Sequence, residues 1–134
     1  MTNISHDLDP SVLNQLYDQL HTSFGKLDAA RTELFLSDLL GYEERVMLAK
    51  RLAAILLIAG GCSLYKVADR LSVSPTTAKT IKMKFDNGGY DRLLGVLVKQ
   101  KSVVIEILET LDNILHLGGI LPHYNGLDRY KYVR

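Results

Sequence analysis

The sequence of 134 residues has one cysteine, three prolines and no hydrophobic run long enough to cross a membrane. Because Cys62 has no partner, the chain cannot close an internal disulfide. Residues 1–10 are acidic and polar, whereas a secretion signal is basic and then apolar. The longest uncharged apolar stretch, residues 52–61, is much shorter than the roughly 20 residues that span a bilayer. We therefore expect a cytoplasmic protein without a membrane anchor.

The residue patterns of common catalytic and metal sites are also lacking. Cys62 has no candidate base beside it in the sequence, and each pair of neighbouring glycines follows an expected helix instead of joining a strand to a helix. The four histidines are scattered, so no spacing typical of a zinc site arises. We expect no enzymatic activity, no metal and no cofactor.

The net charge of +1 hides a strong asymmetry between the two ends of the chain. Residues 1–44 contain eight acidic and two basic side chains, a net charge of −6. Residues 62–84 contain five basic side chains and one acidic side chain, a net charge of +4. Such a segment attracts a polyanion. The alternative is a basic face that is only solvated.

The spacing of apolar residues predicts an all-α fold, because they recur at intervals of three and four along almost the whole chain. The helix over residues 42–59 is apolar nearly all round and should be the central one. We expect a single domain over residues 1–119 and a basic, aromatic tail over residues 120–134. The six expected helices cover residues 10–25, 28–40, 42–59, 63–71, 75–85 and 90–117.

Residues 63–86 have the pattern of a helix-turn-helix. Each of the two short helices has one apolar face, and the turn between them is only about three residues long. Ser74 is suited to cap the second helix and Pro75 to open it. With Ala78 and Ile81 turned into the core, a row of threonine and lysine side chains must face outward.

That outward row is typical of a recognition helix. Threonine can bind base edges or contact a thymine methyl group, and lysine can bind guanine or phosphate in the major groove. The residues expected to read bases are Thr76, Thr77, Lys79 and Thr80. The residues expected to bind phosphates are Lys66, Arg70, Ser74, Lys82 and Lys84.

Residues 38–85, with the sequence DLLGYEERVMLAKRLAAILLIAGGCSLYKVADRLSVSPTTAKTIKMKF, resemble the Trp repressor superfamily of bacterial DNA-binding proteins. The shared features are the DLL start, the acids and Arg45 that open the central helix, Arg51 within it, and a glycine before the helix-turn-helix. The resemblance implies an intertwined homodimer that places two recognition helices in successive major grooves and represses transcription. It also implies that Thr76, Thr77 and Thr80 read bases.

The same resemblance does not extend to a tryptophan corepressor. Of the two arginines that enclose the ligand in the family, one corresponds to Arg51, but Ile81 occupies the position of the other, and Gly41 that of a ligand-binding threonine. We do not expect tryptophan to bind. Arg51 is kept as a candidate residue for a pocket that binds a different effector, the alternative being a surface arginine paired with an acid such as Glu44.

Two neighbouring apolar stripes on the expected helix 90–117 also indicate dimerisation, because a helix that packs only within its own chain usually needs a single apolar stripe. The first stripe has Leu97, Val104, Leu108, Leu111 and Leu115, and the second has Val96, Val103, Ile107 and Ile114.

The function predicted is that of a homodimeric regulator of transcription that binds specific double-stranded DNA. Two alternatives stay open: an accessory DNA-binding protein of replication or of mobile elements, and a helical protein-interaction module.

Overall fold

The computed structural model describes residues 8–118, and within them the protein is all-helical without a strand, as predicted, but it has seven helices where six were expected. The chain forms two compact units, residues 1–45 and 46–134. No described helix is long and apolar enough to cross a membrane. The expected tail over residues 120–134 lies outside the described residues. The helices are α1 (Pro10–Gly25), α2 (Ala29–Leu39), α3 (Tyr42–Ala59), α4 (Leu64–Leu71), α5 (Pro75–Asp86), α6 (Asp91–Val98) and α7 (Lys101–Leu115).

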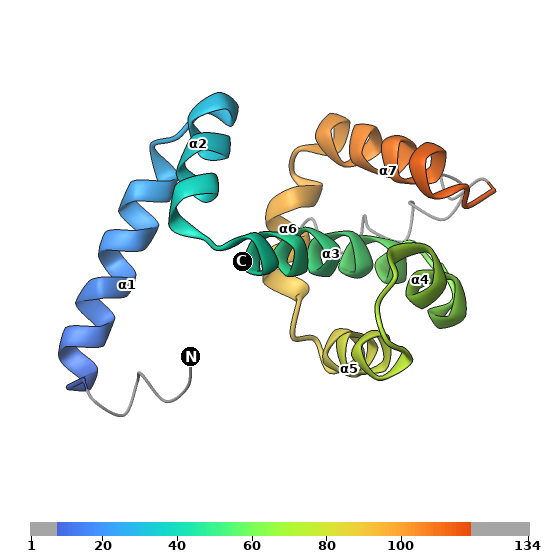
Figure 1. Cartoon of the computed structure of the whole chain (residues 1–134), viewed down its shortest axis with the longest axis horizontal. Coiled ribbons are helices and arrows are strands. Elements are labelled where there is room, and N and C mark those ends of the chain that lie inside the picture. The colour runs from blue at the N-terminus through green and yellow to red at the C-terminus, as the bar shows by residue number, and fades with distance from the viewer. Residues whose placement is uncertain (1–7, 119–134) are drawn as a thin grey trace. The chain divides into compact units, whose positions relative to one another are not determined.

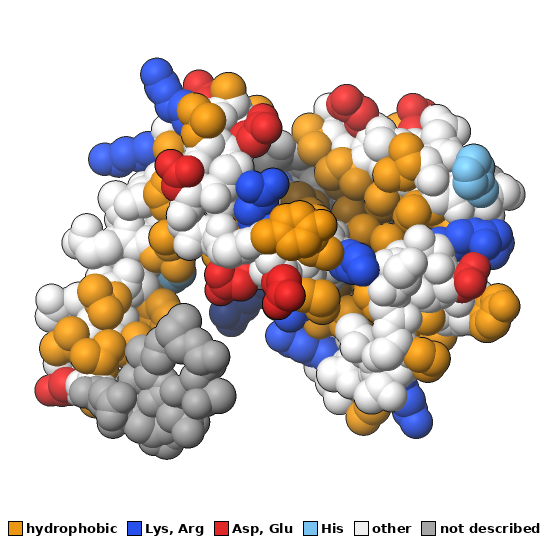
Figure 2. All heavy atoms as spheres, viewed as in Figure 1, with side chains coloured by type: hydrophobic (Ala, Val, Ile, Leu, Met, Phe, Trp, Pro, Cys, Tyr) orange, Lys and Arg blue, Asp and Glu red, His pale blue; other side chains and the backbone are white. Residues whose placement is uncertain are grey.

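Helices α1 and α2 of the first unit begin at aspartate caps. The Asp9 carboxylate accepts a hydrogen bond from the Ser11 amide at 3.1 Å, and the Asp28 carboxylate accepts one from the Arg31 amide at 2.8 Å. The two helices contain no buried residue. Five large apolar side chains of α1 are 40% to 51% exposed: Val12, Leu16, Tyr17, Leu20 and Phe24. The apolar stripe of α1 is therefore about half exposed within the described chain, and Figure 2 shows hydrophobic side chains, in orange, on the surface of this helix.

Helix α3 is the central helix of the second unit, as its composition predicted. Six consecutive residues, from Ala54 to Ala59, are at most 8% exposed. Burial on all sides requires neighbours all round, and α3 runs between α7 and α5 in the view of Figure 1. The core that surrounds it takes Val67 from α4, Ile81 from α5, Leu94 from α6 and Leu108 from α7.

Helices α4 and α5 lie where the helix-turn-helix was predicted, and they pack against each other. Ser63 caps α4 by accepting a hydrogen bond from the Lys66 amide at 3.2 Å. The turn consists of residues 72–74. Ser72 adopts the left-handed conformation with φ 54° and ψ 48°, and Val73 packs against the core. A short turn fixed at both ends sets the angle between the two helices.

The single long helix predicted over residues 90–117 is wrong. The chain breaks after Val98, and Gln100 leaves the helical region with φ −108° and ψ 65° before α7 begins. An unbroken helix of this length would extend about 42 Å, too far for both ends to reach one small core. The break folds α7 back on α6, so that Leu94 and Val98 share a core with Val104 and Leu108.

This break also divides the two apolar stripes expected on that helix. Val104 and Leu108 of the first stripe are buried in their own chain, and its other members pack partly against the same core. Val96 and Ile114 of the second stripe are both 62% exposed. Only the second stripe therefore keeps members available to a partner.

Candidate nucleic-acid interface

The start of helix α5 is held by the two residues predicted to begin it. Ser74 Oγ accepts a hydrogen bond from the Thr77 amide at 3.0 Å, and Pro75 occupies the first turn. The Ser74 hydroxyl also donates to Thr77 Oγ1 at 2.8 Å. The hydroxyl expected to bind a phosphate is thus occupied within the helix cap.

The outward row of α5 has the helical phase that the sequence predicted. Ala78 and Ile81 are buried, with 1% and 7% of their surface exposed. The four residues expected to read bases lie on the other faces: Thr76, Lys79 and Thr80 are exposed and Thr77 is half-buried. This side of α5 is free to contact a ligand in the described chain.

The three threonines differ in the hydrogen bonds they can still make. Thr80 Oγ1 donates to the Thr76 carbonyl oxygen at 2.9 Å, which leaves Thr80 its lone pairs and its methyl group. Those groups suit an amino group of adenine or cytosine, or the methyl group of thymine. Thr77 accepts from Ser74, so its own proton remains available for a purine acceptor.

The four cations expected to bind phosphates each have a partner within the described residues. Two form exposed ion pairs on their own helices: Arg70 with Asp69 at 2.8 Å and Lys82 with Asp86 at 2.5 Å. Such pairs contribute little to stability, so a phosphate can replace the carboxylate at small cost. Lys82 Nζ also lies 5.5 Å from the centre of the Phe85 ring.

Lys66 and Lys84 are held differently. Lys66 is half-buried, and its Nζ donates to the carbonyl oxygen of Leu117 at 3.1 Å, so its ammonium group closes the end of α7. Lys84 Nζ lies 4.8 Å from the centre of the Tyr90 ring. The Lys84 stem runs close to Gly89, where an added Cβ would overlap Cγ of the lysine. Of the basic side chains on α4 and α5, only that of Lys79 has no ion pair, hydrogen bond or ring contact with the described residues.

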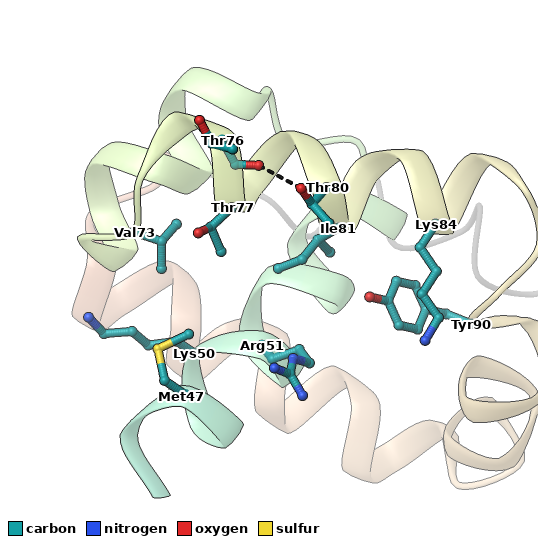
Figure 3. Close-up of a pocket in the computed structure, with 10 residues that line it drawn as sticks. All are labelled: Met47, Lys50, Arg51, Val73, Thr76, Thr77, Thr80, Ile81, Lys84 and Tyr90. Atoms are coloured by element: carbon teal, nitrogen blue, oxygen red, sulfur yellow. Dashed lines mark hydrogen bonds between the residues drawn. The ribbon is translucent and has the colours of Figure 1, made fainter. Parts of the chain in front are cut away.

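A cleft of about 320 Å³, here called the α3–α5 cleft, lies between these two helices (Figure 3). Arg51, Lys50 and Lys84 bring three cations to it, and none of its lining residues is acidic. Arg51 forms no ion pair within the described residues, and Glu44 instead accepts from the Gly41 amide at 2.7 Å. The cleft is lined by Met47, Lys50, Arg51, Val73, Thr76, Thr77, Thr80, Ile81, Lys84 and Tyr90.

The lining brings together residues that the sequence placed in separate roles. All three threonines expected to read bases line the same cleft as Arg51, the candidate effector residue (Figure 3). Lys50 and Tyr90 were not predicted to belong to a site. No local pattern connects Lys50 with the turn 22 residues later, where its Nζ donates to the Ser72 carbonyl oxygen at 3.1 Å.

Cys62 is half-buried immediately before the cap of α4. Burial raises the pKa of its thiol above the ordinary value, and the nearby charges of Lys66 and Arg70 lower it by a smaller amount. The described residues contain no cluster of histidine, cysteine or acidic side chains that could hold a metal.

The raised pKa predicts slow alkylation of Cys62 in the folded protein. The folded chain favours the protonated thiol, so this contribution to stability is present below the unfolded pKa and is lost as the pH rises through the folded pKa. We expect the iodoacetamide rate to rise at higher pH for the native protein than for the protein in urea. Cys62 is the sole cysteine, so the signal is specific. A native midpoint at or below the unfolded one would contradict this prediction.

Comparisons with protein-family models, with curated proteins and with solved structures find no match to this chain. The similarity of residues 38–85 to the Trp repressor superfamily therefore remains a prediction from those residues.

Proposed function

We propose that this protein is a regulator of transcription, most simply a repressor, that binds specific double-stranded DNA through α5 in the major groove. The observation that carries the proposal is the outward row of α5, where Thr76, Lys79 and Thr80 are exposed while Ala78 and Ile81 anchor the helix in the core. An α-helix with short polar and basic side chains fits the width of that groove.

Phosphate contacts would surround this helix. Arg70 and Lys82 can exchange an exposed carboxylate for a phosphate, and Lys84 stands at the border of the α3–α5 cleft. Lys66 is the least available because its ammonium group already holds the end of α7. The proposal therefore assigns Lys66 a structural role in place of the expected phosphate contact.

A homodimer is part of the proposal, in the Trp repressor-like arrangement that the sequence resemblance implies. The supporting observation is the amount of exposed apolar side chain: the stripe of α1 is about half exposed, Leu34 of α2 is 68% exposed and Leu52 of α3 is 39% exposed. Monomeric proteins rarely leave so much apolar surface uncovered. A second copy would also supply a second recognition helix, which raises affinity and sets the distance between half-sites. The cytoplasm is the proposed location.

The test is to select bound fragments from random DNA and to measure two variants on the selected and on random sequences. Thr80→Ala should lower the affinity for the selected sequence about thirtyfold and that for random DNA almost not at all, because the dimer loses two base contacts of about 1 kcal/mol each. Lys82→Ala should weaken both by a similar factor, because it removes a phosphate contact. Equal losses of Thr80→Ala on both DNAs would remove Thr80 from base reading.

A gel shift with mixed genomic DNA separates this proposal from its alternatives. No shift at moderate salt would favour a helical protein-interaction module, whose basic face binds an acidic protein. A shift whose selected sites lie at replication origins or in mobile elements would favour the accessory role. Selected sites upstream of genes support regulation of transcription.

The α3–α5 cleft favours an additional property, the binding of a small anionic effector near Arg51. Three cations without a carboxylate provide the charge, and Met47, Val73 and Ile81 provide an apolar wall. Tryptophan is not proposed as the ligand, because Ile81 lines the cleft where the family pattern has its second arginine.

A further inference from the structure

Four helices of this protein, α3, α4, α5 and α7, are followed by a residue with positive φ, and these four ends are of two kinds. Gly61 after α3 and Gly88 after α5 adopt positive φ values of 95° and 78°, which cost glycine little because it has no Cβ. Ser72 after α4 and His116 after α7 adopt φ values of 54° and 53°. These are the two non-glycine residues with positive φ among the described residues, and their side chains make that conformation unfavourable.

Both non-glycine ends receive a hydrogen bond from a lysine of another helix. Lys50 of α3 donates from Nζ to the Ser72 carbonyl oxygen, and Lys66 of α4 donates to the carbonyl oxygen of Leu117, the residue after His116, each at 3.1 Å. Neither glycine end receives a hydrogen bond from a lysine in the described part of the chain. A cation at a helix C-terminus is also favoured by the helix dipole.

We propose that Lys50 is a positioning residue for the recognition helix, and this inference rests on the proposed DNA-binding function. Its ammonium group stabilises the left-handed conformation of Ser72. That conformation allows the Val73 amide to donate to the Ala68 carbonyl oxygen at 3.1 Å, which closes α4. The cap of α5, Ser74, follows two residues later, so the conformation of Ser72 determines the direction in which α5 leaves the turn.

A competing role for Lys50 is direct contact with a DNA phosphate, since it also lines the α3–α5 cleft. The two roles have different signatures. A phosphate contact adds to affinity for every sequence and to the salt dependence. A positioning residue affects the alignment of α5 with the bases, and therefore the selected sequence alone.

The first measurement uses the free protein and no DNA. In Lys50→Met, which keeps the apolar stem, the Val73 amide should exchange with deuterium about three- to tenfold faster, because one charged hydrogen bond at the turn is lost. Lys50→Arg should stay near the wild-type rate. Ser72→Gly should remove most of the effect of Lys50→Met, because glycine adopts the left-handed conformation without help. Lys99→Met, an exposed lysine at the end of α6, is the control.

The second measurement compares selected with random DNA. Lys50→Met should lower affinity for the selected sequence about three- to tenfold, with unchanged binding to random DNA and an unchanged salt slope. The inference is overturned if the Val73 amide of Lys50→Met exchanges no faster than that of Lys99→Met. It is also overturned if Lys50→Met speeds this exchange equally in the wild-type background and in the Ser72→Gly background. Equal losses on both DNAs with a smaller salt slope also overturn it, in favour of phosphate binding.

The two measurements separate failure of this inference from failure of the proposed function. A wild-type protein that binds neither DNA overturns the proposed function and, with it, positioning for DNA. The exchange rates still show in that case whether Lys50 holds the turn. An unchanged exchange rate in Lys50→Met overturns the inference about Lys50 while DNA binding by the wild-type protein stands.

Discussion

Replacing Lys79 with glutamate should lower DNA affinity by about 100-fold without destabilising the fold. Lys79 belongs to the residues expected to read bases, and its ammonium group in the groove can bind guanine or phosphate. Each such cation contributes about eightfold at 0.1 M salt, and a dimer loses two of them and gains two repelling charges. Lys79 is exposed on the outward row of α5 and has no ion pair or hydrogen bond with the described residues, so its replacement disturbs little else. Fluorescence anisotropy over a series of salt concentrations measures both the affinity and a salt slope smaller by about two.

The control for this variant is Lys99→Glu, which makes the same change of charge at an exposed position after α6. It should cost threefold or less, because charges far from the DNA are screened within about 10 Å at this salt concentration. Similar losses in the two variants would show that only net charge matters. That result would remove α5 from the interface.

Replacing Leu57 with alanine should lower the free energy of unfolding by about 2–5 kcal/mol, since the site loses apolar burial and leaves a cavity. Leu57 is fully buried near the C-terminal end of α3, among neighbours from the other helices of the second unit. Urea unfolding followed by circular dichroism gives the loss directly. A loss below about 1 kcal/mol would contradict the central position of α3.

Leu52→Ala on the same helix is the matched variant. Leu52 is 39% exposed, so in dilute protein its replacement should cost about 1 kcal/mol or less. If a second copy covers this surface, the cost grows as the protein concentration rises, because unfolding is then coupled to dissociation. A cost that is independent of concentration would place the dimer contact elsewhere.

Much of the fold could be predicted because local residue types determine where several helices begin. Pro10 is tolerated in the first turn of α1, and the Ser74 side chain caps α5. The apolar composition of α3 was enough to identify it as the central helix. The break between α6 and α7 could not be predicted in this way. Neither proline nor glycine occurs at residues 98–101, and the break is decided by burial of distant residues such as Leu94 and Leu108.

In the candidate site, too, local features could be predicted and contacts between distant residues could not. The phase of Ala78 and Ile81 follows from a repeat of three to four residues, so the outward row of α5 could be read from the sequence. The hydrogen-bond partners of Lys66 and Lys50 could not be predicted, because the flexible stems of these side chains reach groups that are distant in the sequence. Lys66 meets Leu117 across 51 residues, and Lys50 meets Ser72 across 22.

The close approach of Gly89 to the stem of Lys84 has a consequence for how this surface can vary. A methyl group at position 89 would overlap Cγ of Lys84 and lie 3.0 Å from its carbonyl oxygen, so the lysine stem, whose ammonium group now lies over the Tyr90 ring, would have to move. One of the three cations would then leave the wall of the cleft, although no ionisable group had been altered. The electrostatic potential beside the threonines is therefore controlled in part by the bulk of a neutral residue in the following loop.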